Sequence, residues 1–289
     1  MRGIREMVHS ATDVILTLNS VKGKNLINHD VIRPFAPLRV TRWAISRMPF
    51  MKFSVFHILL FLILLFPSIV IPQEGKDPFF MKEDFNTLDN WKPLYFPKIK
   101  KHTSYTIETD GNERYLKAES AASASALIYN REFNVYKYRN MRWRWRAENV
   151  YEKGVTGTKK GDDYPLRIYI TFKYDPQKAG RLERLRYEGA KLLYGEYPPH
   201  SALNYVWANK ETTERLITSP YTSKTKIIII EKGTIRVGSW EAKEADILKD
   251  YREAFGEDPP SQASIAIMND SDNTGEGSIS YLDYIEIYK

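Results

Sequence analysis

The sequence predicts an all-β protein: a β-sandwich with two inserted helices, preceded by one N-terminal hydrophobic helix. Many short runs rich in β-branched and aromatic residues are separated by Gly, Pro, Asn and Asp, as is typical of strands joined by turns. Two of these runs alternate strictly between apolar and polar residues, which indicates a sheet with one buried face. Helical spacing of apolar residues is found in two segments of the body, so we expect helices as excursions from the sheets.

The strand predictions begin with a hairpin, in which residues 104–109 and 115–119 flank the turn sequence at 110–112. Residues 141–147 alternate, with two tryptophans on one side and three arginines on the other. Residues 166–174 alternate in the same way. Further strands are predicted at residues 127–130, 133–138, 203–208, 226–231, 235–240, 263–268 and 278–287.

The two helix predictions fall on residues 179–194 and 242–255. In the second segment, Ile247, Tyr251 and other apolar residues follow one stripe. Gly256 can adopt the left-handed conformation that ends a helix, and the two prolines that follow it prevent continuation. No internal repeat recurs at a fixed period, which argues against solenoids and propellers.

Residues 53–73 contain no charged side chain and are long enough to cross the hydrocarbon core of a membrane as a helix. Basic residues precede this segment and acidic residues follow it, so the positive-inside rule places the body outside the cytoplasm. The segment is either an uncleaved anchor or a signal peptide that starts at Met51. The small residues of a cleavage site are missing, which favours the anchor.

This interpretation divides the chain into four parts. Residues 1–52 form a basic segment that is disordered or lies upstream of the true start, and residues 53–73 form the anchor or signal peptide. Residues 74–80 form a linker and residues 81–289 form the β-sandwich. The protein is then membrane-anchored with its body in the periplasm or at the cell exterior, or secreted if the segment is cleaved.

The formal net charge of +7 comes almost entirely from the N-terminal part. Residues 1–52 hold nine Lys or Arg and three acidic residues, whereas the remainder holds 34 basic and 33 acidic residues. The basic character therefore belongs to the flank of the hydrophobic segment, and nucleic acid is not an expected partner.

The chain has no cysteine, which excludes thiol nucleophiles, thiolate metal sites and disulfides. No cofactor is expected.

Five sequence motifs point to one family. They are W-R-W-R at 143–146, G-D-D-Y-P-L-R-I-Y-I at 161–170, L-N-Y-V-W-A at 203–208, D-Y-R-E-A-F-G-E-D-P-P at 250–260 and I-A-I-M-N-D-S-D-N-T-G at 265–275. Through them, roughly residues 83–288 resemble an uncharacterised family of exported bacterial proteins, domain of unknown function 3047. The resemblance implies export, and it brings no established activity, catalytic residue or ligand. More loosely, residues 85–146 are similar to jelly-roll carbohydrate-binding modules, so the expected sandwich is jelly-roll-like.

A ladder of arginines is the first candidate site. The three arginines of 141–147 share one face, and the polar side of 166–174 would extend that face if the two strands are neighbours. Guanidinium groups among aromatic rings suit carboxylates, sulfates or sugar rings. The alternative is a solvated outer face on which the arginines pair with acids. The candidate ligand-binding residues are Arg142, Arg144, Arg146, Asp163, Arg167 and Tyr169.

The loop at 270–276 is the second candidate site. Its oxygen-bearing side chains at alternate positions before Gly275 imitate the start of a calcium loop, with Asp270 and Asp272 as ligands of a structural calcium ion. The imitation ends at the twelfth position, where Tyr281 replaces the bidentate Glu, and the flanking segments are strands. The alternative is a hairpin turn made of ordinary turn residues.

Catalytic motifs are missing from the sequence. The body contains two histidines, His102 and His200, and neither has the spacing of a nucleophilic or metal site. The E-x-D-x-x-E pattern of jelly-roll glucanases is approached at 281–286, where Tyr281 stands in place of the first carboxylate. Strand alternation also predicts that Asp283 and Glu286 point to opposite faces.

The sequence therefore predicts a non-catalytic ligand-binding domain outside the cytoplasm. Its expected ligand is a glycan or an anionic polymer of the cell envelope. Two alternatives stay open: an enzyme that acts on envelope carbohydrate, and a structural or assembly protein of the envelope.

Overall fold

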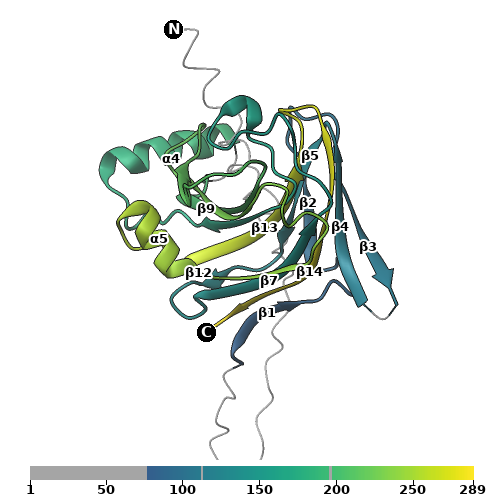
Figure 1. Ribbon diagram of the computed structural model, residues 1–289. Coiled ribbons are helices and arrows are strands. Elements are labelled where there is room, and N and C mark those ends of the chain that lie inside the picture. The colour runs from purple at the N-terminus through teal and green to yellow at the C-terminus, as the bar shows by residue number, and fades with distance from the viewer. Residues whose placement is uncertain (1–76, 112, 195–196) are drawn as a thin grey trace, which may run out of the picture. The chain divides into compact units, whose positions relative to one another are not determined.

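Two β-sheets pack face to face in the part of the chain that the computed structural model describes, residues 77–289 without residues 112, 195 and 196 (Figure 1). The hydrophobic segment 53–73, the basic segment before it and residues 74–76 of the linker lie outside the described residues. Among the described residues, none of the helices has the length and apolar character needed to span a membrane. The predictions for residues 1–76 therefore stay predictions.

The first sheet, sheet A, has six strands in the order β12-β7-β14-β4-β3, with β1 also paired to β14. Its long strand β14 pairs with β4 along its first half and with β1 along its second half. The strands are β1 (Phe79–Glu83), β3 (Ser104–Asp110), β4 (Glu113–Ala121), β7 (Asn140–Ala147), β12 (Glu241–Asp246) and β14 (Gly277–Tyr288).

The second sheet, sheet B, has eight strands in the order β10-β11-β9-β8-β13-β5-β2, with β6 paired to β13. The pair β9 and β11 is parallel and the other pairs are antiparallel. The strands are β2 (Trp91–Leu94), β5 (Ala124–Tyr129), β6 (Phe133–Asn134), β8 (Arg167–Phe172), β9 (Ser201–Ala208), β10 (Leu216–Thr218), β11 (Thr225–Lys232) and β13 (Gln262–Asp270).

Aromatic side chains join the two sheets. Trp143 and Trp145 point inward from β7, and the ring of Trp145 lies 6.0 Å from that of Trp207 on β9. Trp143 packs 5.9 Å from Tyr205 in the same way. All four are fully buried, and large buried rings supply much of the apolar area that stabilises such an interface. The prediction of an inward tryptophan face on residues 141–147 is confirmed.

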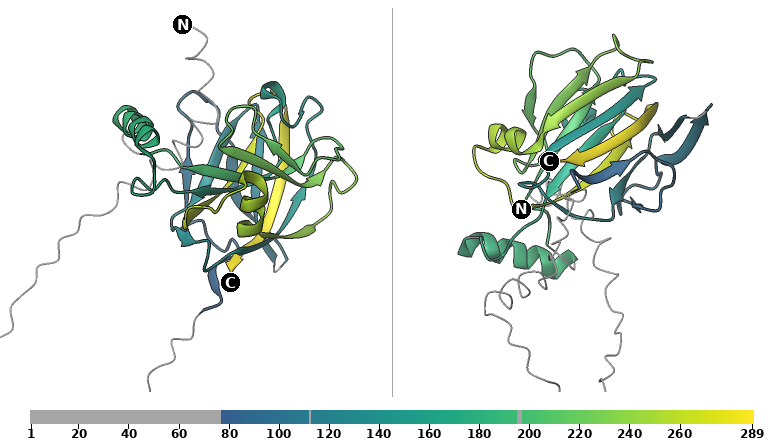
Figure 2. Two further views of the ribbon diagram at one scale, coloured as in Figure 1. Left: turned by 90° about the vertical axis from the view of Figure 1, so that its left-hand side faces the viewer. Right: turned by 90° about the horizontal axis from the view of Figure 1, so that it is seen from below.

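Two α-helices interrupt the described strands, α4 (Arg181–Tyr194) and α5 (Ile247–Phe255), as the sequence predicts. Figure 2 shows α4 at the edge of the body and the β3–β4 hairpin projecting from the sandwich. Leu182 and Leu185 on α4 are exposed to solvent. The prediction of a β-sandwich with two inserted helices is thus confirmed.

The predicted boundaries around residue 240 are wrong. Residues 235–240, predicted as a strand, form turns, and the strand β12 comes directly after them. The second helix begins at Ile247 rather than at Ala242. The segment 241–246 has helix-favouring residues, but antiparallel pairing with β7 along its whole length determines its conformation.

Strand β12 lies at the edge of sheet A and carries an inward charge. The Nζ atom of Lys243 lies 2.7 Å from Oε2 of Glu231 on β11 and 3.1 Å from Oε2 of Glu241. All three side chains are largely shielded from solvent. The Lys243–Glu231 ion pair therefore connects β12 of sheet A to β11 of sheet B.

Candidate functional site

The outer face of sheet A carries the three arginines that the sequence assigns to it. Each of them pairs with a carboxylate: Arg142 with Glu286, Arg144 with Asp283 and Arg146 with Glu148. The distance from Arg144 Nη1 to Asp283 Oδ2 is 3.0 Å. The three guanidinium side chains are between 25% and 45% exposed, so they remain open to a ligand.

A β-bulge in β14 brings two acids onto this face. Leu282 pairs with Trp145 of β7 and Tyr284 pairs with Arg144, so that Asp283 is the extra residue. A bulge interrupts the period-two alternation of a strand. As a result, Asp283 and Glu286 both pair with outward arginines, and the prediction that they point to opposite faces is wrong.

Three aromatic rings from separate segments meet beside the arginines. The ring of Tyr115 on β4 lies 5.3 Å from that of Tyr281 on β14 and 5.6 Å from that of Trp240, which precedes β12. The guanidinium groups of Arg144 and Arg146 each lie 5.0 Å from the Trp240 ring. All three rings are half-buried, so part of each ring surface is accessible.

These residues form what we term the outer-face site. Its members are Tyr115, Arg144, Arg146, Trp240, Tyr281 and Asp283.

The aromatic members of the site were not predicted from the sequence. Tyr281 could have been found, because it holds an outward position two residues after Ile279 in an alternating strand. Trp240 could not, because it lies in a turn and reaches the face through its tertiary contacts.

A hollow of about 660 Å³ adjoins the outer-face site at β14. Asp283 belongs to both, and Tyr284 and Glu286 extend the wall of the hollow along β14. The other wall is formed by residues of β3, β4 and the segment after β1. The lining residues are Asp84, Asn86, Thr109, Gly111, Glu113, Arg114, Asp283, Tyr284 and Glu286.

The structure does not place the other three predicted ligand residues on this face. Strand β7 belongs to sheet A and β8 to sheet B, so the expected extension of the arginine ladder is wrong. Arg167 and Tyr169 on β8 are 3% and 6% exposed, and Asp163 is fully buried. Tyr169 packs within a second apolar cluster with Phe96, Ile128 and other residues, which covers the outer side of sheet B.

Arg167 sits at the centre of a buried charge cluster. It pairs with Asp270, and its Nη1 atom lies 3.7 Å from Asp162 Oδ2. The rings of Tyr164 and Tyr169 lie 5.0 and 5.6 Å from its guanidinium carbon. Burial raises the pKa of the Asp162 carboxyl to about 6, against the opposing influence of the Arg167 charge.

The loop after β13 is held by a buried aspartate. Asp163 accepts hydrogen bonds from the backbone N–H of Thr274, at 2.6 Å, and from Nδ2 of Asn273, at 2.9 Å. Gly275 adopts a left-handed conformation with φ of 73°. The loop connects β13 in sheet B to β14 in sheet A, so it crosses between the sheets and is not the hairpin turn considered as an alternative.

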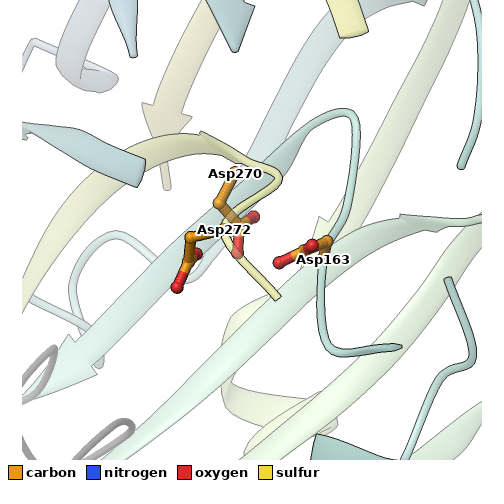
Figure 3. A group of neighbouring side chains, drawn as sticks. All are labelled: Asp163, Asp270 and Asp272. Carbon is orange, nitrogen blue, oxygen red and sulfur yellow. The ribbon is translucent and has the colours of Figure 1, made fainter. Parts of the chain in front are cut away.

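Three carboxylates converge at this loop. One oxygen from each of Asp163, Asp270 and Asp272 lies within 4.8 Å of the others. Figure 3 shows that Asp163 reaches the loop from a different segment of the chain. Burial, together with the nearby Asp163 charge, raises the pKa of Asp272. Calcium favours clustered carboxylate oxygens, but Arg167 already pairs with Asp270, so calcium binding here stays a prediction.

The fold and the outer-face site define a β-sandwich protein with an accessible aromatic and arginine-rich sheet face. Over residues 89–286 the chain matches the model of a family described as "Protein of unknown function (DUF3047)", and it belongs to that family. This confirms the resemblance found in its motifs. No match was found among curated proteins.

The chain is structurally similar to jelly-roll carbohydrate-binding modules and lectins. One similar structure is the family 11 carbohydrate-binding module from Clostridium thermocellum in complex with a β-1,3-1,4-mixed-linked tetrasaccharide, with a TM-score of 0.35, 12% identity and coverage of 71% of this chain and 92% of that one.

Two further similar structures come from other groups of proteins. The xyloglucanase domain of NopAA from Sinorhizobium fredii, in complex with cellobiose, has a TM-score of 0.35 and 8% identity, and 73% of this chain and 98% of that one are covered. The lectin from Bauhinia forficata in complex with GalNAc has a TM-score of 0.31 and 9% identity, with 72% and 97% covered.

Proposed function

We propose that this protein binds a glycan on the outer face of sheet A, at the outer-face site. The observation that carries the proposal is the group of half-exposed rings of Tyr115, Trp240 and Tyr281 around two arginines. The C–H faces of sugar rings pack against aromatic rings, and guanidinium groups donate paired hydrogen bonds to hydroxyl or carboxylate oxygens. The site offers both kinds of contact within one surface.

The arrangement of the rings supports an extended ligand. Tyr115 and Tyr281 lie on adjacent strands, and Trp240 reaches them from the far side of β7. A chain of sugar rings that crosses these strands would contact several rings in succession. Large, rigid aromatic side chains provide such contact area at a low cost in conformational entropy.

The proposed place of action is outside the cytoplasm. The support is the uncharged segment 53–73 and the basic residues before it. An envelope or extracellular glycan would then be available to the body. The protein would be anchored by that segment, or secreted if it is cleaved.

The test is a binding measurement with a glycan array, followed by isothermal titration with the best ligand. We expect Trp240→Ala and Tyr281→Ala to weaken binding about tenfold or more each, as is usual for aromatic residues at the centre of an interface. Tyr95→Ala is a matched control, because Tyr95 is 54% exposed, follows β2 of sheet B and packs against His102, which is not a member of the outer-face site. If both sheet A variants bind as tightly as the unaltered protein, the proposal fails.

A second candidate function is hydrolysis of a glycan in the hollow. The observation in its favour is the presence of Asp84, Glu113, Asp283 and Glu286 in one lining, since most glycoside hydrolases use a pair of carboxyl groups. Against it, Asp283 and Glu286 already pair with arginines. Release of reducing ends from the bound glycan, abolished by Glu113→Gln or Asp283→Asn, would support hydrolysis.

A further inference from the structure

The arginines of the outer-face site carry little uncompensated charge. Arg144 pairs with Asp283, and Arg146 Nε lies 2.7 Å from Glu148 Oε1. Arg142, next along β7, pairs with Glu286, which also lies 3.9 Å from Lys82 Nζ. Each guanidinium group therefore already has an anionic partner, and a polyanion would have to displace that partner in order to bind.

The adjoining hollow is more acidic than basic. Two of its four carboxylates, Asp283 and Glu286, already pair with arginines of β7, so the acidic excess comes from Asp84 and Glu113. Its one arginine, Arg114, donates from Nη1 to Asn86 Oδ1 at 3.1 Å. An anionic ligand that continued from the rings into this hollow would meet charges of its own sign. Juxtaposed like charges disfavour a wrong ligand even where the other contacts fit.

We propose that the ligand of this face is an uncharged glycan, and that an anionic envelope polymer is excluded by the paired carboxylates. This inference rests on the proposed glycan-binding function. Sugar hydroxyls both donate and accept hydrogen bonds, so they can donate to Asp283 or Glu286 while they accept from Arg144 or Arg142. An arginine–carboxylate pair thus matches a hydroxyl-bearing ligand without being broken.

The first experiment compares uncharged and anionic polysaccharides with the full-length protein. The uncharged probes are β-glucan, xyloglucan, mannan and galactan, and the anionic probes are polygalacturonate and dextran sulfate. We expect an uncharged probe to bind with a Kd that changes less than about twofold between about 50 mM and about 500 mM NaCl, because screening affects charged contacts. Binding of an anionic probe that weakens about tenfold or more over this range would overturn the inference.

The second experiment removes the compensating charges. In the variant Asp283→Asn with Glu286→Gln, Arg142 and Arg144 lose their partners, so we expect a gain of dextran sulfate binding at low salt. The control is Glu214→Gln with Glu257→Gln, which makes the same change in net charge at exposed positions outside the site. If the unaltered protein binds dextran sulfate as well as the first variant does, the carboxylates do not exclude anions and the inference is wrong.

A third variant avoids disturbing any ion pair of the ladder. Asp84 and Glu113 line the hollow and are exposed, so Asp84→Asn with Glu113→Gln should fold normally. We expect this variant to bind the uncharged glycan about three- to tenfold more weakly, since it replaces charged acceptors with neutral ones. If this variant binds the uncharged glycan as tightly as the unaltered protein does, the ligand does not contact the hollow, and the part of the inference that rests on the hollow is wrong.

Failure of every uncharged and anionic probe to bind the unaltered protein would instead overturn the proposed function itself.

Discussion

Arg167 illustrates why a polar residue in an alternating strand need not face solvent. The alternation of residues 166–174 correctly separates two sides of β8, and Ile168, Ile170 and Phe172 lie in the core between the sheets. The side that carries Tyr169 is buried as well, because Tyr169 packs in an apolar cluster with Phe96, Ile128 and other residues. Alternation reports which residues share a side, but it cannot report whether another layer of chain covers that side.

At Arg167 we expect a large loss of stability without a specific loss of binding. Arg167→Met leaves Asp162 and Asp270 buried without their cationic partner, and breaking a buried pair in this way costs about 3–5 kcal/mol. Arg142→Ala is the control, because the Arg142 side chain is 45% exposed and an ion pair at the surface contributes about 0–1 kcal/mol. Urea denaturation measures both, and equal effects of the two substitutions would contradict the buried role of Arg167.

Asp162 gives the protein a pH-dependent stability. Burial raises its pKa in the folded state to about 6, above the usual aspartate value of 3.8. The folded state therefore takes up a proton before the unfolded state does, and the unfavourable buried charge disappears as the pH falls through about 6. We expect the free energy of unfolding of the unaltered protein, relative to Asp162→Asn, to rise by on the order of 2 kcal/mol between about pH 7 and about pH 4.

The quantity to measure is the difference in the free energy of unfolding between the unaltered protein and Asp162→Asn. His200 opposes the trend, because burial lowers its pKa, and Glu83 adds to it, because burial raises its pKa. Both contributions are the same in the unaltered protein and in Asp162→Asn, so they cancel in the difference. Denaturant titrations at several pH values give this difference. If the free energy of unfolding changes with pH by the same amount in both proteins, Asp162 does not titrate in this way.

At the scale of elements, the bulge in β14 and the turn before β12 set the geometry of the outer-face site. The bulge turns Asp283 toward Arg144, and the turn before β12 delivers Trp240 to the same surface. Both are local irregularities. Periodic patterns in a sequence locate regular strands and helices, whereas a bulge depends on the register between two strands that are distant in the chain.

Asp246 connects β12 to α5, and we expect its removal to destabilise both. Its carboxylate accepts a hydrogen bond from the backbone N–H of Lys249 at 3.0 Å, which caps the helix, and it pairs with Arg139. Asp246→Ala should cost about 1–2 kcal/mol, the usual effect of losing an N-cap. Asp246→Asn keeps a capping oxygen, so thermal or urea denaturation should show a smaller loss. Equal losses would assign the effect to the ion pair with Arg139.

For the whole molecule, the sequence predicts the sandwich and its tryptophan core better than it predicts the site. The opposed faces of 141–147 are enough to place Trp143 and Trp145 inside and three arginines outside. The assignment of β7 and β8 to different sheets depends instead on how many strands lie between them, which their own residues do not encode. The meeting of Tyr115, Trp240 and Tyr281 likewise depends on how separate segments assemble into sheet A.

The location of the whole chain is tested by removing one segment. We expect the full-length protein to sediment with membranes when cells that express it are fractionated, because residues 53–73 can cross the hydrocarbon core. A variant that lacks residues 53–73 should be recovered in the soluble fraction. If the intact, unprocessed chain is found in the soluble cytosolic fraction, the proposed place of action is wrong.

The inward ion pair of β12 has a consequence for how copies of this domain behave when many are crowded together. A strand from a neighbouring copy could lengthen sheet A beyond β12 only by packing against Lys243, whose ammonium is already held by Glu231 and Glu241. Charges that point inward from an edge strand discourage this kind of growth. In a dense layer of the protein on a surface, the molecules should thus stay separate, and fibres should not grow by strand pairing at the β12 edge of sheet A.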